Sequence, residues 1–457
     1  MIKRKALLAA GVTTALAAAL VGCSAGNGGG GGGGGNNAGA SKTNCANDVK
    51  VKDVPVVTYW GWLPDTEMTV DNFNETNDDV QICWSNAGQG GDQYTKLSTS
   101  LQSKSGAPDI VQVEYDWLNS FLIQGGLVDM TEHGIEEYKD NFTEGAWRDV
   151  SSGDGVYAVP VDLGPVGMWY RADIFEEHGI AIPTTWDEYA AAAEQLDAAT
   201  GGAVKIGNFA PNGQGQHYAF LDQAGAVPFE FDNGNQTEIT INHNDDASKK
   251  VFEYWIDLVE RGLVGTDQAW TPEFSTGLGG GKYATAVYPV WYNAHIPDFE
   301  NPEAGAVWRA APIPQWDTAN PVQVNWGGST LAVTTQASDA ALATKVAAEL
   351  YNTEERQKLG VEEGGLFLAM PEMIESDYFK DLEYEFFGNQ KFNGEFFVQA
   401  ALDYEGVQFS PFTQYYYDEM QRLLSESIEG NSTASEAMDA LQESLETYAT
   451  EQGFTLN

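Results

Sequence analysis

The residues whose chemistry best suits a ligand are aromatic, amide and acidic side chains that follow predicted strands in the first part of the chain. Residues 54–60, 80–84 and 110–113 each favour a β-strand, and the segments between them favour helices. The carboxyl ends of parallel strands meet at one edge of a sheet, which is where ligands bind. We therefore expect a cluster at that edge, comprising Trp60, Trp62, Gln89, Glu114, Tyr115 and Asp116.

This combination of side chains suits a sugar. A flat aromatic face packs on the C–H face of a pyranose ring, while carboxylates and amides form hydrogen bonds with its hydroxyl groups. Each single Trp or Tyr has the alternative of a place in the hydrophobic core. The hypothesis therefore concerns the cluster as a whole.

The elements that position this cluster predict an α/β fold. The order strand–helix–strand–helix–strand predicts a parallel sheet with helices on its faces. The roughly 410 residues beyond the N-terminal region are too many for one hydrophobic core, so two lobes are expected.

The stretch from Gly155 to Tyr189 predicts the passage from one lobe to the other. Residues 156–161 favour a strand, in which Pro160 indicates an edge position. A turn that begins at Asp162 ends this strand, and a capping box over residues 185–188 opens a new helix. Asp162 therefore joins the candidate ligand-binding residues.

Further candidates lie in later parts of the chain, where it enters and leaves the second lobe. Trp291 follows a predicted strand, and the two glycines after Trp326 would let a ligand or a backbone segment approach closely. The candidates from this part of the chain are Trp270, Trp291, Tyr292, Trp326, Gly327, Gly328 and Phe367.

The sequence resembles a known family in several ordered segments. GVYAVP from Gly155, MWYRADIFEEHGI from Met168 and PTTWDEY from Pro183 resemble the lobe crossover of family 1 extracellular solute-binding proteins, the maltose-binding-like receptors of ABC importers. Phe274 to Tyr292 resembles a second landmark of this family. The resemblance covers most of the chain beyond the N-terminal region. It implies two lobes, each a sheet flanked by helices, joined by three hinge crossings.

The resemblance also implies a domain organisation and partners. One lobe would comprise 49–162 and 312–355, and the other 163–311 and 356–457. The N-terminal sequence itself predicts a signal peptide over residues 1–23, and a Gly-, Asn- and Ser-rich composition predicts a flexible tether over residues 24–48. The closed receptor would dock as a monomer on the transmembrane subunits of an ABC permease. A carbohydrate would be the ligand, and an oligosaccharide is favoured because there are more candidate aromatics than one ring can use.

The N-terminus predicts export. A basic segment over residues 3–5 precedes an apolar segment over residues 6–21, and the sequence LVGC then ends at Cys23. This is a bacterial lipobox pattern, in which Cys23 is lipidated and anchors the protein to the cell membrane by its lipid alone. An ordinary signal peptide and an uncleaved anchor are the alternatives, and all three place the body outside the cytoplasm.

Two cysteines remain after Cys23. In an exported chain, Cys45 and Cys83 suggest one disulfide, with two buried free thiols as the alternative. Two cysteines alone are too few for a structural zinc site.

The charge of the chain narrows its partners. The net charge is −44, with acidic residues spread along the chain. Without a basic stripe there is nothing to neutralise phosphates, which argues against nucleic acid, and long-range repulsion argues against an anionic ligand. We expect no cofactor, since Gly281-Lys282 lacks the spacing of a phosphate-binding loop. We also expect no metal, since His217 has no second His or Cys nearby.

Other classes of protein stay open as alternatives. A secreted glycosidase would use two of Glu114, Asp116 and Asp162 as an acid/base pair, but nothing places two carboxyls at a hydrolytic separation. An iron receptor of the same two-lobe type would use adjacent tyrosines such as those at 415–417, although this run more simply opens a helix. A peptide receptor of this type is the third alternative. The mixture of aromatics and carboxylates favours carbohydrate.

Overall fold

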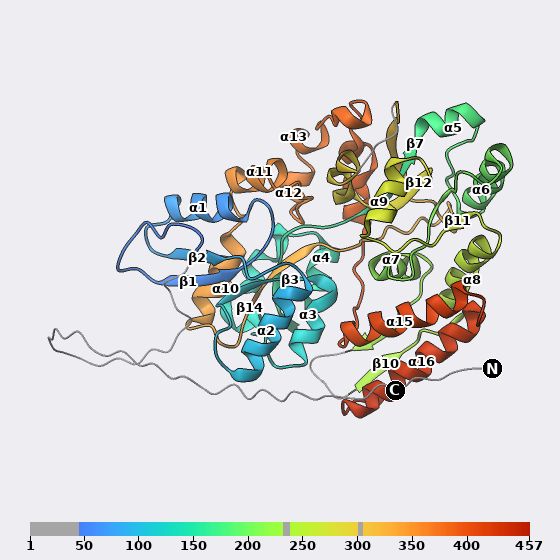
Figure 1. Cartoon of the computed structure of the whole chain (residues 1–457). Coiled ribbons are helices and arrows are strands. Elements are labelled where there is room, and N and C mark those ends of the chain that lie inside the picture. Colours follow the sequence, from blue (N-terminus) through green and yellow to red (C-terminus); the bar gives the residue numbers. More distant parts are fainter. Residues whose placement is uncertain (1–44, 232–237, 300–304) are drawn as a thin grey trace, which may run out of the picture. The chain divides into compact units, whose positions relative to one another are not determined.

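The structure is a computed structural model that describes residues 45–231, 238–299 and 305–457 (Figure 1). The predicted signal peptide with Cys23, and most of the predicted tether, lie outside the described residues. The described residues belong to one compact unit. None of the helices that the structure describes has both the length and the apolar character needed to cross a membrane.

The first sheet has five strands in the order β2-β1-β3-β14-β6. As predicted, β1 pairs in parallel with β2 and β3, while β14 is antiparallel to β3 and β6. The edge strand β6 contains Pro160, so the predicted edge position is confirmed. The bounds are β1 Val56–Trp60, β2 Gln81–Ser85, β3 Ile110–Glu114, β6 Ala158–Pro160 and β14 Ser329–Val333.

Helices cover this sheet with their apolar faces. In α2, Tyr94 and Leu97 are buried three residues apart and so lie on one side of the helix. α10 contacts β14 and β1, and α1 contacts β2 and α11 (Figure 1). The helices of this part are α1 Thr66–Thr76, α2 Gly91–Ser103, α3 Tyr115–Leu122, α4 Glu144–Asp149, α10 Ala340–Glu349 and α11 Glu354–Glu362; the short elements between them are η1 Met130–His133, η2 Ile135–Asn141, β4 Ser151–Ser152 and β5 Gly155–Val156.

The second main sheet is antiparallel and has β7 at its centre, with β12 and β13 on either side. All of β7 is buried, and Trp169 lies 5.0–5.8 Å, between ring centroids, from Phe387, Phe392 and Phe397. The strands are β7 Val166–Arg171, β12 Thr285–Pro289 and β13 Trp308–Pro312; smaller sheets contain β8 Gly207–Asn208, β9 Phe229–Phe231, β10 Glu238–Ile241, β11 Val264–Gly265 and β15 Thr455–Leu456.

The helices of this second part include two that begin with the capping boxes seen in the sequence. Thr185 accepts from the Glu188 amide, and Thr433 accepts from that of Glu436, with both reciprocal bonds formed. The helices are α5 Ala172–His178, α6 Trp186–Thr200, α7 Gln214–Gln223, α8 Asp246–Glu260, α9 Pro272–Gly279, α12 Pro371–Ile374, α13 Asp377–Lys380, α14 Val398–Asp403, α15 Thr413–Ile428 and α16 Ala434–Glu451, with η4 Val290–Ala294, η5 Ile296–Asp298, η6 Glu385–Phe387 and η7 Asn393–Phe397. The last long helix, α16, ends at Glu451.

Three connecting segments lie side by side where the chain passes between the two main sheets. The Leu163 amide donates to the Phe367 carbonyl at 2.8 Å, and the Trp326 amide donates to the Gly164 carbonyl at 2.8 Å. The Asn325 side chain accepts from the Gly164 amide at 2.6 Å. These bonds hold the three predicted crossings together.

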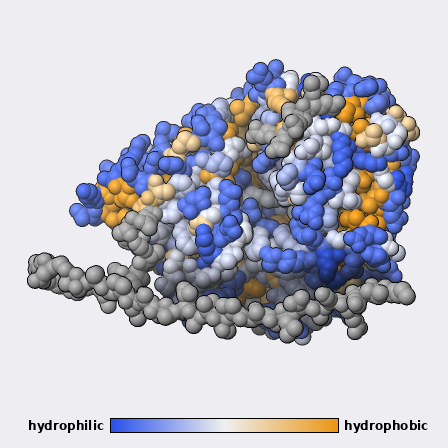
Figure 2. All heavy atoms as spheres, viewed as in Figure 1, coloured by the Kyte–Doolittle hydropathy of each residue, from blue (hydrophilic) through white to orange (hydrophobic). Residues whose placement is uncertain are grey.

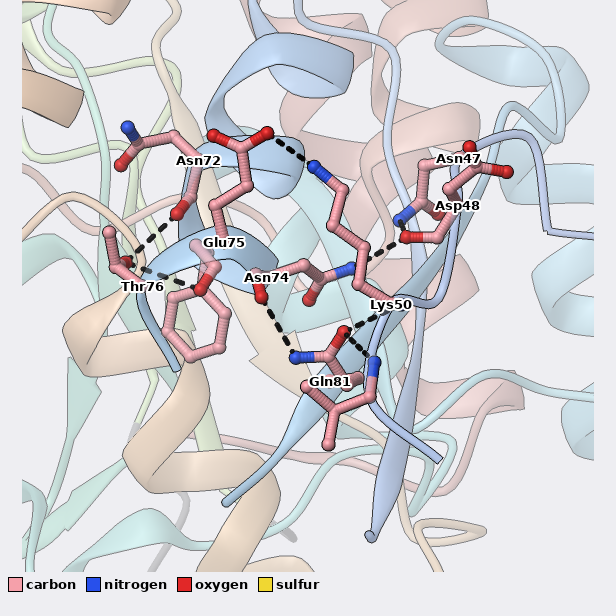
Figure 3. Close-up of polar contacts among 10 residues, drawn as sticks. Asn47, Asp48, Lys50, Asn72, Asn74, Glu75, Thr76 and Gln81 are labelled. Carbon is pink, nitrogen blue, oxygen red and sulfur yellow. Dashed lines mark hydrogen bonds and ion pairs between the residues drawn. The ribbon is translucent and has the colours of Figure 1, made fainter. Parts of the chain in front are cut away.

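The start of the described chain is fastened to the free edge of β2. Cys45 and Cys83 form the predicted disulfide. The Asn47 and Asn74 side chains form hydrogen bonds with backbone groups of Ile82 and Trp84 on the outer side of β2. The Gln81 side chain accepts from the Lys50 amide at 2.9 Å (Figure 3). An edge strand with unpaired backbone groups is open to aberrant pairing, so this segment protects the sheet.

Replacing Cys45 and Cys83 together by Ser is expected to lower the free energy of unfolding by about 4 kcal/mol. The disulfide closes a span of 38 residues, and its loss frees the unfolded chain. Urea unfolding of the wild type and the variant measures the difference. Reduction of the wild type should reproduce the variant, and equal stability of oxidised and reduced protein would contradict the prediction.

Hydrophilic residues cover most of the face seen in Figure 2. The exposed large hydrophobic residues of the described chain include a single tryptophan, Trp270, whose exposed fraction is 54%. An exposed tryptophan of this kind needs an explanation, which the neighbouring cavity supplies.

A candidate ligand-binding cavity

A cavity of about 630 Å³ collects residues from distant parts of the chain. It is lined by residues that follow β1 and β3, by the first residues of α7, by η4, by the three crossing segments and by α15. The predicted site residues that line it are Trp62, Gln89, Glu114, Asp116, Asp162, Trp270, Trp291, Trp326, Gly327 and Gly328.

Four predicted residues do not line this cavity. Tyr115, Tyr292 and Phe367 are buried, and Trp60 is partly buried against the core. Tyr115 lies beneath Gly328, and Tyr292 packs on Tyr288 with their ring centroids 4.3 Å apart. These four side chains therefore support the walls of the cavity rather than form its surface.

Residues outside the predicted set also line the cavity. Trp117 directly follows the predicted residue Asp116. Tyr417 comes from α15, 301 residues after Asp116, and no local pattern connects them. The remaining additional lining residues are Leu63, Pro64, Asn212, Gly213, Gln214, Gly215, Tyr218, Ala294, His295, Asn325, Ser329, Gly364, Gly365, Leu366 and Phe409.

Three tryptophans form an aromatic wall. The rings of Trp270 and Trp291 are nearly parallel, at 18° with centroids 6.0 Å apart, and Trp326 lies edge-on to Trp291 at the same separation. Trp291 Nε1 donates to the Trp326 carbonyl at 3.1 Å. Trp270 has φ = +65°, a left-handed conformation that is rare for a bulky residue. This backbone conformation and the exposed ring make Trp270 a candidate functional residue.

Glycines allow the crossing segments to lie under this wall. Gly328 has φ = +105°, and a Cβ there would lie 2.5 Å from the Asp162 carbonyl oxygen. A Cβ at Gly164 would lie 2.1 Å from the Trp326 carbonyl oxygen. Both positions require glycine for this close approach.

Gly328→Ala is expected to cost about 2 kcal/mol more than Gly179→Ala in chemical unfolding. Gly179 also has positive φ, +63°, but nothing lies within 4 Å of a Cβ there. Both variants place a Cβ on a residue with positive φ, which is unfavourable in each. Only in Gly328→Ala does the added Cβ also collide with neighbouring atoms. Equal losses in the two variants would show that the backbone next to Gly328 yields easily.

Three carboxyl groups, those of Glu114, Asp116 and Asp162, also line the cavity. The Tyr94 hydroxyl lies 3.4 Å from the Glu114 carboxyl, the Tyr417 hydroxyl donates to Asp116, and the Ser329 amide donates to Asp162 at 2.7 Å. Burial raises the pKa of all three: Glu114 to about 8, with repulsion from Asp116 and Asp162 adding to it, Asp162 to about 7 and Asp116 to about 6. A protonated carboxyl can donate as well as accept a hydrogen bond.

Helix α7 begins at the cavity. Gly213, Gln214 and Gly215 line it, and the first amides of a helix have no partner within the helix. They are suited to donate to ligand oxygen atoms.

Among the described residues, no group of three or more His, Cys, Asp or Glu side chains is placed to hold a metal ion. Of the tyrosines at 415–417, Tyr417 lines the cavity, Tyr416 is buried and Tyr415 stacks on Tyr448.

The fold and the cavity define a two-lobe α/β protein that binds a solute in a cavity formed by both parts of the chain. A model of the bacterial extracellular solute-binding proteins matches residues 69–384, and the chain belongs to this family. Membership of this family places the protein outside the cytoplasm, among solute-binding proteins.

Three known proteins are similar to this chain. The arabinooligosaccharide-binding protein of Halalkalibacterium halodurans is 24% identical over 368 residues, which are 77% of this chain and 79% of that protein. The ABC transporter associated binding protein of B. animalis subsp. lactis Bl-04, solved with beta-1,6-galactobiose, is 29% identical with a TM-score of 0.74, covering 89% of this chain and all (100%) of that one. The galacto-N-biose/lacto-N-biose I-binding protein of Bifidobacterium longum, at 23% identity and a TM-score of 0.75, covers the same shares and has the same fold.

Proposed function

We propose that this protein captures an oligosaccharide outside the cytoplasm and delivers it to the permease of an ABC importer. The observation that carries the proposal is the cavity in which Trp270, Trp291 and Trp326 form one wall and carboxyl groups line another part. Aromatic faces stack on sugar rings, and the carboxyls and the α7 amides bind hydroxyl groups. The similar proteins that were named or solved with oligosaccharides support this class of ligand.

The ligand would act by favouring one arrangement of the two lobes. Residues from both parts of the chain line the cavity, so a ligand that touches both sets binds best when they are closed around it. A volume of about 630 Å³ lies within the range of small-molecule sites and admits more than one sugar ring. The permease would then recognise the closed protein.

We propose one lobe of residues 49–162 with the segment from β14 to α11, and a second lobe of residues 163–311 with the segment that follows α11. The expected division after residue 355 would fall inside α11, which contacts α1 of the first lobe. The pairing of β14 with β3 and β6 supports the return of the chain to the first lobe after β13. The pairing of β15 with β10 supports the place of the C-terminus in the second lobe.

We also propose that Cys23 carries a lipid anchor, that the protein is a monomer, and that the cavity carboxyls bind hydroxyl groups rather than catalyse hydrolysis.

Thermal unfolding of the purified protein with a ligand panel tests the function. The panel contains arabinotriose, galactobiose, lacto-N-biose and maltotriose, and also amino acids, a dipeptide and ferric ion. We expect a saturable rise in melting temperature with at least one glycan, since a ligand at about 100 times its Kd stabilises by about 2.7 kcal/mol. A response to peptide, amino acid or iron alone would overturn the carbohydrate proposal, and release of reducing sugar would indicate an enzyme.

A further inference from the structure

The cavity has an uneven distribution of charge. The described residues that line it include Glu114, Asp116 and Asp162 but neither lysine nor arginine. Among the described residues, the hydrogen-bond partners of the three carboxyls are uncharged groups: the phenols of Tyr94 and Tyr417 and the Ser329 amide. The lining thus offers a ligand negative charge that no cationic side chain of the lining balances.

We propose that the cavity selects among carbohydrates by charge, binding neutral or amine-bearing oligosaccharides and rejecting those with a uronic acid. This inference rests on the proposed function and adds the chemical class of the sugar. A carboxylate on the ligand would meet carboxylates of the same sign in a partly dry cavity, where like charges repel more strongly than in water. An ammonium group would meet the attraction of the same three groups.

Two features of the cavity would attract an anionic sugar, but their attraction is weaker than the repulsion from the three carboxyl groups. The N-terminus of α7 contributes a partial positive charge equivalent to about half an elementary charge, and only near its first turn. His295 also lines the cavity, where its ring lies about 6 Å from those of Trp270 and Trp291, on the aromatic side. Against these stand three carboxyl groups, two of which, Asp116 and Asp162, add to the repulsion felt by Glu114.

Repulsion of an anionic ligand by the three cavity carboxyls can be separated experimentally from repulsion by the net charge of the whole chain. The net charge of −44 repels any anion at long range, but salt at about 0.5 M screens charges beyond roughly 4–5 Å. Charges within the cavity are screened much less. Selection by the three carboxyls therefore persists in high salt, whereas general repulsion by the surface does not.

Matched ligands test the inference by calorimetry at about 0.5 M salt. Galactobiose, lacto-N-biose and arabinotriose are each compared with two derivatives, in which the terminal primary alcohol is oxidised to a carboxylate or converted further to the carboxamide. The carboxamide has the shape of the carboxylate without its charge. For each glycan that binds, we expect the carboxylate to bind about a hundredfold more weakly than the carboxamide, and the gap to widen as the pH rises from about 6 to about 8.5 because more of the cavity carboxyls ionise.

Variants locate the effect. Glu114→Gln should narrow the gap between carboxylate and carboxamide several-fold, while Glu253→Gln, on the exposed face of α8, should leave it unchanged. A carboxylate that binds as tightly as its carboxamide would overturn the charge inference and leave the carbohydrate function standing. If no glycan of either kind binds, the proposed function fails and the inference fails with it.

Discussion

Raising the pH from about 5 to about 8.5 is expected to cost the ligand-free protein about 4 kcal/mol of unfolding free energy through Glu114 and Asp162. Burial, with repulsion from neighbouring carboxyls, raises the pKa of Glu114 to about 8, and burial raises that of Asp162 to about 7. In the unfolded chain both titrate near about 4. The native state therefore holds more protons than the unfolded state in this window, so stability falls as the pH rises.

The size of the effect follows from the shifts. A shift of about three pKa units corresponds to about 4 kcal/mol for one isolated group. Both carboxyls line a cavity that solvent can enter, and solvent screens part of this cost. About 2 kcal/mol for each group is therefore the expected loss.

Denaturant unfolding at several pH values measures the effect as a difference between proteins, because the many other acidic residues also titrate. The double variant Glu114→Gln, Asp162→Asn keeps the shape of both side chains and removes their ionisation, so its stability should decline less steeply above about pH 5. Glu253→Gln should keep the wild-type slope. Parallel pH profiles for the wild type and the double variant would mean that the two carboxyls ionise as freely in the native state as in the unfolded chain.

Features of the fold that depend on local chemistry could be predicted from the sequence. The capping boxes at Thr185 and Thr433 each need only four consecutive residues, and Pro160 can occupy only an edge or a strand end. The disulfide followed from the small number of cysteines in an exported chain. Each of these features is fixed by a few neighbouring residues or by composition.

Only those site residues whose position follows from the order of the strands could be predicted from the sequence. Trp62, Glu114 and Asp116 line the cavity because they follow parallel strands, whose ends share one edge. Tyr115, between Glu114 and Asp116, does not, because successive residues of a strand or helix point in different directions. Trp60 does not either, since it is still part of β1 and packs against the core. Which of two adjacent side chains faces the cavity depends on the exact residue at which the strand ends. An error of one residue in that position would assign a cavity residue to the core, and a core residue to the cavity.

Residues that reach the cavity only through the packing of distant elements have no local sequence pattern that predicts their place there. Tyr417 lies on α15, and its hydroxyl donates to the Asp116 carboxylate. The helix could be predicted from its sequence, but its contact with α3 depends on the packing of the whole chain. Trp270 gave only its residue type, since its left-handed backbone and its exposure are visible in three dimensions alone.

Trp291→Ala is expected to weaken binding of the cognate glycan by about a hundredfold to a thousandfold, or about 3–4 kcal/mol. Trp291 lies at the centre of the aromatic wall, with Trp270 stacked beside it and Trp326 edge-on. Truncation removes a stacking surface and also the donor to the Trp326 carbonyl, which holds the second crossing segment in place. Residues at the centre of a desolvated contact carry most of its free energy.

Two further variants separate the causes of the loss. Trp291→Phe loses the indole donor but keeps an aromatic face, which is smaller than that of indole, so it should retain more affinity than Trp291→Ala. Trp316→Ala removes a half-buried tryptophan that does not line the cavity and should leave affinity within a few-fold of the wild type. Calorimetry gives the affinities, and thermal unfolding without ligand shows whether each variant is folded. A Trp291→Ala protein that is folded and binds normally would mean that the ligand is held by the carboxyls and the α7 amides, and that the tryptophan wall shapes the cavity without contacting the sugar.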